Sequence, residues 1–275
     1  MAEIFKDIII GQYIPGKSPL HRLNPVVKII FTVAYITVLF LINKPIPYFI
    51  FTLYTLTLVI ISGINIKIIL KGIRPMLWIF IFTAVLNVFM TPGETIWSVP
   101  VFAWSLKITK EGVYAGAMIT VRLLYLIIGT SLLTLTTSPL QLTDGIEKLL
   151  NPLRKIKVPA SEIAMMMTIA IRFIPTLAEE TDKIMKAQTA RSADFQSGNI
   201  IKRAKAMVPL LVPLFISAFR RADELATAME ARCYVSGAKR TRMKETRFTS
   251  FDIKALIIFS IACAALITAQ YCIHL

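Results

Sequence analysis

Long runs of uncharged, mostly apolar residues constrain this chain more than any other feature of its sequence. A helix needs roughly 20 such residues to cross the hydrocarbon core of a lipid bilayer. Lys28 stands near the start of one run, where its aliphatic stem lets the ammonium reach the interface, and Arg122 lies inside another. The five runs long enough to span a membrane are residues 26–43, 45–66, 75–93, 113–135 and 255–273. We therefore expect an all-α integral membrane protein with about five transmembrane helices.

The composition agrees with burial in lipid rather than in a globular core. Hydrophobic residues make up 56% of the 275 residues, and the mean hydropathy is +0.67. Soluble domains contain about 45–50% apolar residues. The three cysteines and two histidines lack the spacing of a disulfide framework or a metal site. We therefore expect no bound metal and no cofactor.

The formal net charge of +15 is concentrated in one stretch, which argues for a membrane topology and against nucleic acid as the partner. Of the 31 Lys and Arg residues, 20 lie between positions 148 and 254. Basic loops beside membrane spans mark the cytoplasmic side. With that stretch inside, a loop at 63–74 and the N-terminus are inside too. The count is then 27 basic residues inside and three outside, namely Lys44, Lys107 and Lys110.

The basic stretch also has the pattern of a helical module. A short amphipathic pattern covers residues 139–150, and two longer helical patterns cover 160–193 and 201–235. Each long pattern begins with an apolar stretch too short to span a bilayer and ends in polar residues, so such a helix can begin against the membrane and finish in water. We expect a cytoplasmic lead-in at 1–25, a four-helix transmembrane unit at 26–137, a cytoplasmic module of long amphipathic coupling helices at 138–250 and a last transmembrane helix at 251–275.

A short internal repeat is the strongest signal in this module. Residues 182–192 match residues 223–233, with Asp, Ala, Ala and Arg at the same offsets, 41 residues apart. Each arginine lies near a predicted helix end between two small residues, which leave the planar guanidinium free to enter a groove on a partner. The helix dipole alone also favours arginine at a C-terminus, so a purely local role is the alternative. The two triplets are Ala190-Arg191-Ser192 and Ala231-Arg232-Cys233.

One motif match in the lead-in is excluded by its neighbours. Residues 11–18 fit the phosphate-binding pattern G-x-x-x-x-G-K-[ST]. That site needs a loop of backbone donors followed by a helix, but Pro15 removes one donor, and Pro19 and Pro25 occupy the place of the helix. The chain also lacks a Ser/His/Asp set, a metal-ligand set and a pair of carboxylates. We therefore expect neither nucleotide binding here nor an enzyme.

Two features leave alternatives open. An ionisable side chain inside a span is a functional candidate by default, but Arg122 could equally pair with a carbonyl or a polar side chain of its own chain. The run Met165–Met167 is adaptable apolar surface that suits a partner, although interior packing would use the same residues.

At the paired triplets the sequence resembles the T components of energy-coupling factor transporters, the family that includes the cobalt-transport and biotin-transport permeases. The stretch from Gly16 to Pro25, with Lys28, is similar to the opening of that family. The resemblance covers nearly the whole chain, and the two small-Arg-small triplets are its most specific part. Cys233 stands where Ser or Gly would serve equally well.

The resemblance implies the non-catalytic energy-coupling subunit of an importer for vitamins or transition-metal ions in a prokaryotic cell membrane. Two ABC-type ATPase subunits in the cytoplasm would receive Arg191 and Arg232 in grooves. One or more small membrane-embedded S subunits would capture the substrate. The coupling helices would contact an S subunit through Met165, Met166, Met167, Leu210, Leu211, Leu214 and Phe215.

Two other functions need different residues. A conventional ABC-type permease that lines its own substrate path needs polar groups along several spans, where this sequence has only Arg122. A membrane-bound lipid-modifying enzyme needs acidic, His or Cys clusters at the cytoplasmic membrane face, and none is evident. A bare electrostatic anchor for anionic lipids would fit the basic stretch but would not need the repeated triplet.

Overall fold

The computed structural model describes residues 13–101, 104–156, 159–191, 193, 195, 199–235, 237 and 248–272. Its contacts divide the chain into two compact units. The first, here called the span unit, is built on residues 13–138 and 246–275. The second, here called the arm unit, is built on residues 139–245.

The span unit consists of helices that begin and end where the local sequence dictates. Proline is the first residue of α2, α3 and α4, where its missing N–H has no helical partner to lose. The Asn24 side chain accepts a hydrogen bond from Val26 N and caps α3, and Gly63 ends α4 with a φ of 65° that glycine adopts without strain. The helices are α2 (Pro19–Arg22), α3 (Pro25–Leu41), α4 (Pro45–Ser62), α5 (Ile66–Ile73), α6 (Leu77–Met90), α7 (Lys110–Thr136) and α11 (Ser250–Cys272).

Within the described residues, five helices are long and apolar enough to cross a membrane: α4, the run Ile66–Met90, α7, α11 and α9 of the arm unit. This confirms the expected all-α integral membrane class. The number agrees with the expectation, but the set differs. Helix α3 has only 17 residues because Pro25 starts it and the chain turns before Pro45, whereas α9 is included although its most apolar stretch has the lowest mean hydropathy of the five, 1.3.

Residues 66–73 form helix α5 where a loop was expected, and the side of the membrane on which the segment lies stays a prediction. Asn65 caps α5 by accepting a hydrogen bond from Lys67 N at 3.1 Å. A single 3₁₀ turn, Arg74–Met76, then joins α5 to α6, because Pro75 takes no part as a backbone donor. The chain therefore continues as helix from Ile66 to Met90 instead of starting a span at residue 75.

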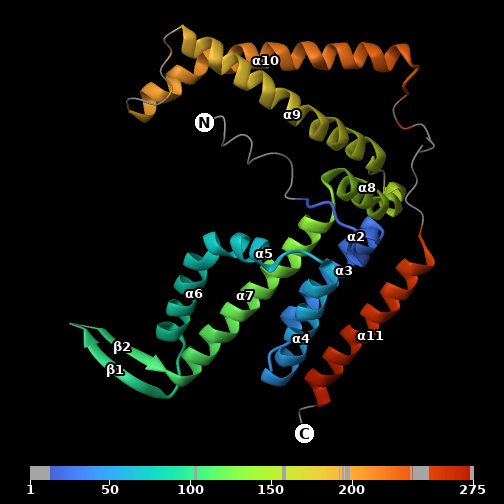
Figure 1. The fold of residues 1–275 in the computed structure, drawn as a ribbon. Helices are drawn as coiled ribbons and strands as arrows, with labels where there is room; N and C mark the ends of the chain where they lie inside the picture. The colour runs from blue at the N-terminus through green and yellow to red at the C-terminus, as the bar shows by residue number, and fades with distance from the viewer. Residues whose placement is uncertain are drawn as a thin grey trace. The chain divides into compact units, whose positions relative to one another are not determined.

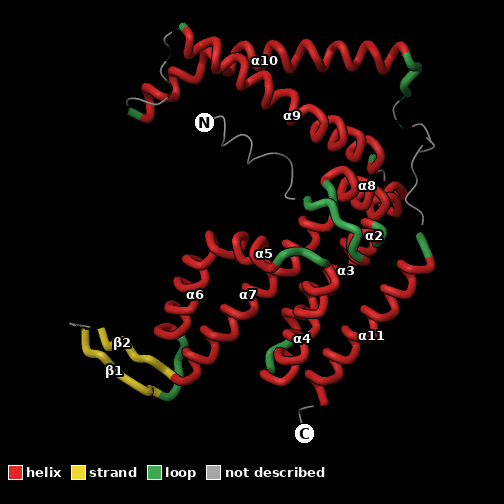
Figure 2. The backbone as a smooth tube through the Cα atoms, in the orientation of Figure 1, coloured by secondary structure: helices red, strands yellow, loops and turns green. Residues whose placement is uncertain are grey.

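A β-hairpin connects the third and fourth apolar runs. Strands β1 (Thr95–Val101) and β2 (Trp104–Thr109) pair antiparallel, with a register shift between Thr95 and Trp97. Figure 2 shows these two strands, in yellow, beside the ends of α6 and α7. They are the only strands in the described part of the chain.

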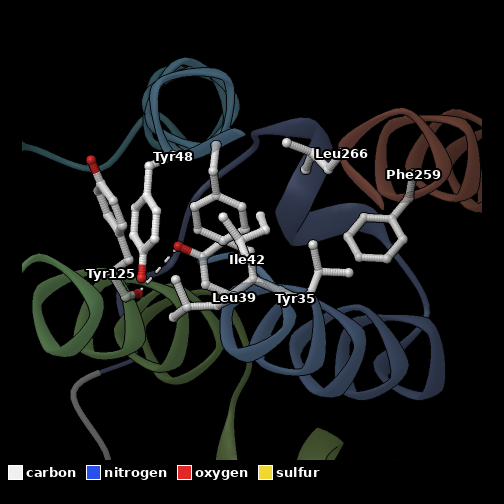
Figure 3. Packing of buried hydrophobic residues seen from close by; sticks show 9 residues of the cluster. Tyr35, Leu39, Ile42, Tyr48, Tyr125, Phe259 and Leu266 are labelled. Carbon is white, nitrogen blue, oxygen red and sulfur yellow. Dashed lines mark hydrogen bonds between the residues drawn. The ribbon is translucent and has the colours of Figure 1, made fainter. Parts of the chain in front are cut away.

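Aromatic side chains form the centre of the span unit (Figure 3). Tyr35 of α3 packs on Phe51 of α4, with ring centroids 4.8 Å apart, and its hydroxyl donates to the carbonyl of Tyr125 on α7 at 3.2 Å. Phe259 of α11 stacks on Phe31 of α3 at 4.2 Å. Helices α3, α4, α7 and α11 thus meet in one cluster, whose buried members are Tyr35, Val38, Leu39, Ile42, Tyr48, Phe51, Tyr125, Phe259 and Leu266.

Glycines on α7 let neighbouring helices approach closely. A methyl group at Gly112 would lie 2.7 Å from the carbonyl oxygen of Val88, and one at Gly116 would lie 3.0 Å from that of Ala84. The four-residue spacing of these glycines is the small-residue pattern of closely packed membrane helices. On another face of α7, a methyl group at Gly129 would collide with the ring of Tyr35.

The arm unit is a set of helices without strands in its described residues. Helix α8 (Pro139–Leu150) leads into a short 3₁₀ helix, Asn151–Ile156, and then into two long helices, α9 (Ala160–Ala190) and α10 (Ile200–Ala231). Both long helices contain internal prolines, which remove a backbone donor and bend a helix. Figure 1 shows α10 changing direction between its N-terminal part and its longer C-terminal part.

We predict that Gly129→Ala lowers the stability of the solubilised protein by about 1–3 kcal/mol, because the added methyl group forces the buried Tyr35 ring or α7 itself to move. Gly72→Ala is the matched control, since no atom lies within 4 Å of the position its methyl group would take. Thermal unfolding in detergent should give a lower midpoint for the first variant only. Equal midpoints would show that α3 and α7 are not in close contact at Gly129.

Candidate functional site

The two predicted docking arginines occupy the same structural position. Arg191 is the C-terminal cap of α9, with φ −88° and ψ 17°, and Arg232 is the C-terminal cap of α10, with φ −92° and ψ 16°. Ala190 and Ala231 are the last helical residues before them. The repeat in the sequence is therefore also a repeat of helix-end geometry.

The chain leaves both helices through the same backbone hydrogen bonds. Ala193 N donates to Gln188 O and Tyr234 N donates to Met229 O, each at 3.0 Å, and each bond spans five residues. At the second end Cys233 N also donates to Glu230 O at 2.9 Å, which completes a Schellman motif. Ser192, the third residue of the first triplet, lies outside the described residues.

Cys233 takes the left-handed conformation that this motif demands. Its φ is 54°, the single positive φ among the described non-glycine residues. A side chain in this region crowds the backbone, so glycine and small residues are favoured. The small size of Cys233, the third residue of the second triplet, thus has a backbone reason.

Both guanidinium groups are available to a partner. Arg191 and Arg232 are exposed, and no described residue accepts a hydrogen bond or forms an ion pair with either side chain. Asp182, which repeats as Asp223, forms its ion pair with Lys186 one helical turn further on, at 3.0 Å. The acidic residue of the repeat therefore does not neutralise the arginine of its own helix end.

A polar cluster of Glu180 on α9 with Ser217 and Arg221 on α10 joins these two helices. Arg221 donates to one carboxylate oxygen of Glu180 at 2.7 Å, and Ser217 donates to the other at 2.8 Å. Glu180 and Arg221 are 41 residues apart, the same offset as the two triplets. Each therefore precedes its docking arginine by 11 residues. From this shared point, equal lengths of helix, about 16 Å each, lead to Arg191 and to Arg232.

The predicted apolar contact residues are mostly exposed within the arm unit. Met166, Met167, Leu211 and Phe215 are exposed, and Phe215 retains 61% of its accessible surface. Met165 and Leu214 are half-buried. Leu210 is buried and so does not contribute to this surface. Exposed neighbours extend the apolar surface of α10: Met207, Val208, Val212, Ile216 and Phe219.

Arg122 has partners within its own chain. Its guanidinium donates to the hydroxyl of Tyr48 at 3.0 Å and to the carbonyl of Ile42 and the side-chain oxygen of Asn43 at 2.9 Å each. It also lies 5.6 Å from the ring centre of Phe40. These groups lie at the end of α3 and the start of α4, so Arg122 joins α7 to both helices. A role towards a partner subunit stays a prediction.

Sequence reasoning missed a buried polar cluster that connects the lead-in to the helices. We expected the Lys28 ammonium to reach the interface, but the residue is buried, with 4% of its surface exposed. Its ammonium donates instead to His21 O at 3.1 Å and to Thr136 O at 2.8 Å. Asp252 is 3% exposed and accepts from Asn24 N and Thr249 N at 2.8 Å each. The sequence signal for this cluster was a charged residue beside the start of two apolar runs, Lys28 in the run 26–43 and Asp252 before the run 255–273.

The phosphate-binding motif match in the lead-in has a different structural role. Ser18 Oγ lies 2.6 Å from Nδ1 of His21, whose Nε2 lies 3.0 Å from the carbonyl oxygen of Ile14. Ile14 N in turn donates to Leu135 O of α7. The helix that follows, α2, has four residues. The described residues contain no group of three or more His, Cys, Asp or Glu side chains that could hold a metal.

Comparison with known proteins gives a consistent result over nearly the whole chain. Residues 16–243 match the model of the cobalt transport protein family, CbiQ. The chain is 54% identical to the energy-coupling factor transporter transmembrane protein of Thermosediminibacter oceani over 97% of its own length and 99% of the relative's. It is 56% identical to the protein of that name from Ruminiclostridium cellulolyticum over 91% and 92%, and 47% identical to that from Bacillus subtilis over 94% and 97%.

We predict that the end of α10 tolerates Cys233→Gly but not Cys233→Val. A β-branched side chain is strained at a φ of 54°, so the valine variant should open the Schellman hydrogen bonds, whereas glycine keeps them. Amide hydrogen exchange at Tyr234 should be about tenfold faster in the valine variant and unchanged or slower in the glycine variant. Identical exchange in the two variants would contradict the left-handed geometry.

Proposed function

This chain belongs to the cobalt transport protein family as one of its energy-coupling factor transporter transmembrane proteins, and we propose that it transmits motion from two cytoplasmic ATPase subunits to a substrate-binding S subunit. It is a multi-pass membrane protein of a prokaryote and a non-catalytic component of a multi-subunit transporter. The finer assignments are the docking residues, the partners and the topology.

The matched helix ends carry the proposal. Two exposed arginines with the same backbone geometry, at equal distances from one shared point, suit two similar partner subunits better than they suit a local capping role. A guanidinium donates in a planar fork, which makes it specific for a groove lined with carbonyl or carboxylate oxygens. Ala190, Arg191 and Ser192 would dock on one ATPase subunit, and Ala231, Arg232 and Cys233 on the other.

The distribution of basic residues supports the orientation. The proposed topology has the N-terminus and residues 138–250 in the cytoplasm, with the lead-in at 1–25, four spans within 26–137 and the last span within 251–275. In this assignment α9 lies along or beneath the bilayer rather than across it, because its second half carries Glu179, Glu180, Asp182 and Lys183. The ATPase subunits are then reached from the polar ends of α9 and α10.

The exposed apolar parts of α9 and α10 would contact the S subunit. Met166 and Met167 of α9, with Leu211 and Phe215 of α10, offer flexible and aromatic surface next to the helix starts. Met165 and Leu214 would lie at its edge. The substrate class we propose, vitamins or transition-metal ions, would be selected by the S subunit and not by this chain.

We predict that Arg191→Gln and Arg232→Gln each reduce uptake at least tenfold, roughly as expected for interface hot spots, and that the double variant abolishes it. Lys186→Gln is the matched control, since it removes the same charge from the same end of α9 at an exposed side chain. The measurements are uptake in cells and co-purification of ATPase subunits with the membrane-inserted variant. Full uptake and full co-purification in the double variant would refute the docking role.

We also predict that exchanging the charges that join α9 and α10 preserves transport, whereas reversing one does not. Arg221→Glu places two carboxylates together and Glu180→Arg places two guanidinium groups together, so each single change should cut uptake about threefold or more. The double exchange restores the pair and should recover most of the uptake. Additive loss in the double variant would show that the pair does not connect the helices.

A further inference from the structure

A cleft in the span unit opens where the lead-in meets the beginning of α11. It has a volume of about 440 Å³ and is lined by Lys17, Pro19, Arg22, Thr249, Phe251 and Asp252. Two basic side chains, Lys17 and Arg22, thus face a common space at the start of α11. The residues of α11 that follow include the exposed apolar Ile253, Ile257 and Ile258. The proposed docking function uses none of these residues.

The two cationic side chains of the cleft have no hydrogen-bond acceptor or ion-pair partner among the described residues. Lys17 and Arg22 are exposed, and neither forms an ion pair or a side-chain hydrogen bond with any described residue. An ammonium and a guanidinium together provide eight N–H donors. Both groups are therefore available to an anion.

Asp252 forms no ion pair with Lys17 or Arg22, although its carboxylate lines the cleft. Its two oxygens accept hydrogen bonds from the backbone of Asn24 and of Thr249, and the residue is almost fully buried. The buried ammonium of Lys28 also attracts it electrostatically. Asp252 instead holds the two walls together, because Asn24 belongs to the lead-in and Thr249 directly precedes α11.

We infer that this cleft binds the phosphate of an anionic phospholipid headgroup. Phe251 is 44% exposed beside the basic side chains, and the apolar surface of α11 begins within one turn. A phosphate that carries acyl chains satisfies the cations and this apolar surface together, whereas inorganic phosphate or a nucleotide satisfies only the cations. The bound headgroup ties the lead-in to the segment by which the chain returns to the membrane.

The test uses the full-length protein in vesicles of equimolar phosphatidylcholine and phosphatidylglycerol, with retained lipids counted by native mass spectrometry. The protein should retain phosphatidylglycerol in preference to phosphatidylcholine. The variant Lys17→Gln/Arg22→Gln should bind it at least tenfold more weakly, as expected for the loss of two basic side chains near a lipid surface. The variant Lys67→Gln/Lys71→Gln, which removes two exposed charges from α5, should bind it normally.

Two further arms distinguish headgroup binding in the cleft from misfolding and from binding of any soluble anion. The charge-preserving variant Lys17→Arg/Arg22→Lys should retain phosphatidylglycerol, which shows that the loss in the glutamine variant comes from charge and not from misfolding. Excess inorganic phosphate or ATP should leave the retained lipid unchanged. Equal loss in the α5 control, or displacement by the soluble anions, would overturn the proposal. The measurement needs no ATPase subunit, so its outcome is independent of the docking proposal.

Discussion

The hydrogen bonds of the Lys28 ammonium organise the end of the span unit at which the lead-in lies. A buried cation is costly unless polar groups replace its water, and here backbone carbonyls of α2 and α7 do so. The carboxylate of Asp252, itself buried, adds α11 and the lead-in to the same cluster. Three segments distant in sequence are thereby fixed near one another, namely residues 21–28, Thr136 and residues 249–252. Thr136 stands close to Ser138, at which the first stretch of the span unit ends, and Thr249 belongs to its second stretch.

Much of the architecture could be predicted because lipid imposes a simple rule on sequence: a long uncharged run becomes a helix. Helices α4, α7 and α11 follow from that rule with bounds within a few residues. The rule says nothing about short segments at the boundary, where local capping decides. Asn65 makes 66–73 helical although Lys67 and Lys71 interrupt its apolar pattern. The role of Lys28 could not be predicted, because an ammonium near a helix start can donate its hydrogen bonds either to water or to backbone carbonyls. Only the packed structure shows that it donates to carbonyls.

The candidate docking site could be predicted from the amino-acid sequence. A repeated arginine between small residues pointed to two equivalent helix ends, and the described residues have them. The sequence alone does not show that Cys233, the third residue of its triplet, adopts a positive φ that favours a small residue. Nor does it show that the 41-residue offset also relates Glu180 and Arg221, the residues that join α9 to α10. Glu180 and Arg221 differ in type, so comparison of the two copies hides their equivalence, which appears only through the bond between them.

Under the proposed function, the equal lengths of helix from the Glu180–Arg221 contact to Arg191 and to Arg232 restrict the motion that the arm unit can transmit. Two segments of equal length that meet at one contact, here Glu180 with Arg221, respond to equal and mirror-related forces at their two ends by opening or closing the angle between them, without a net turn of the pair. If two similar motor subunits pull on Arg191 and Arg232 together, that angle is the coordinate they drive. On the other side of this contact both helices begin apolar and are bent by Pro175, Pro209 and Pro213, so the bends set the direction in which those residues would move. Unequal arms would instead convert the same forces into rotation of the whole unit.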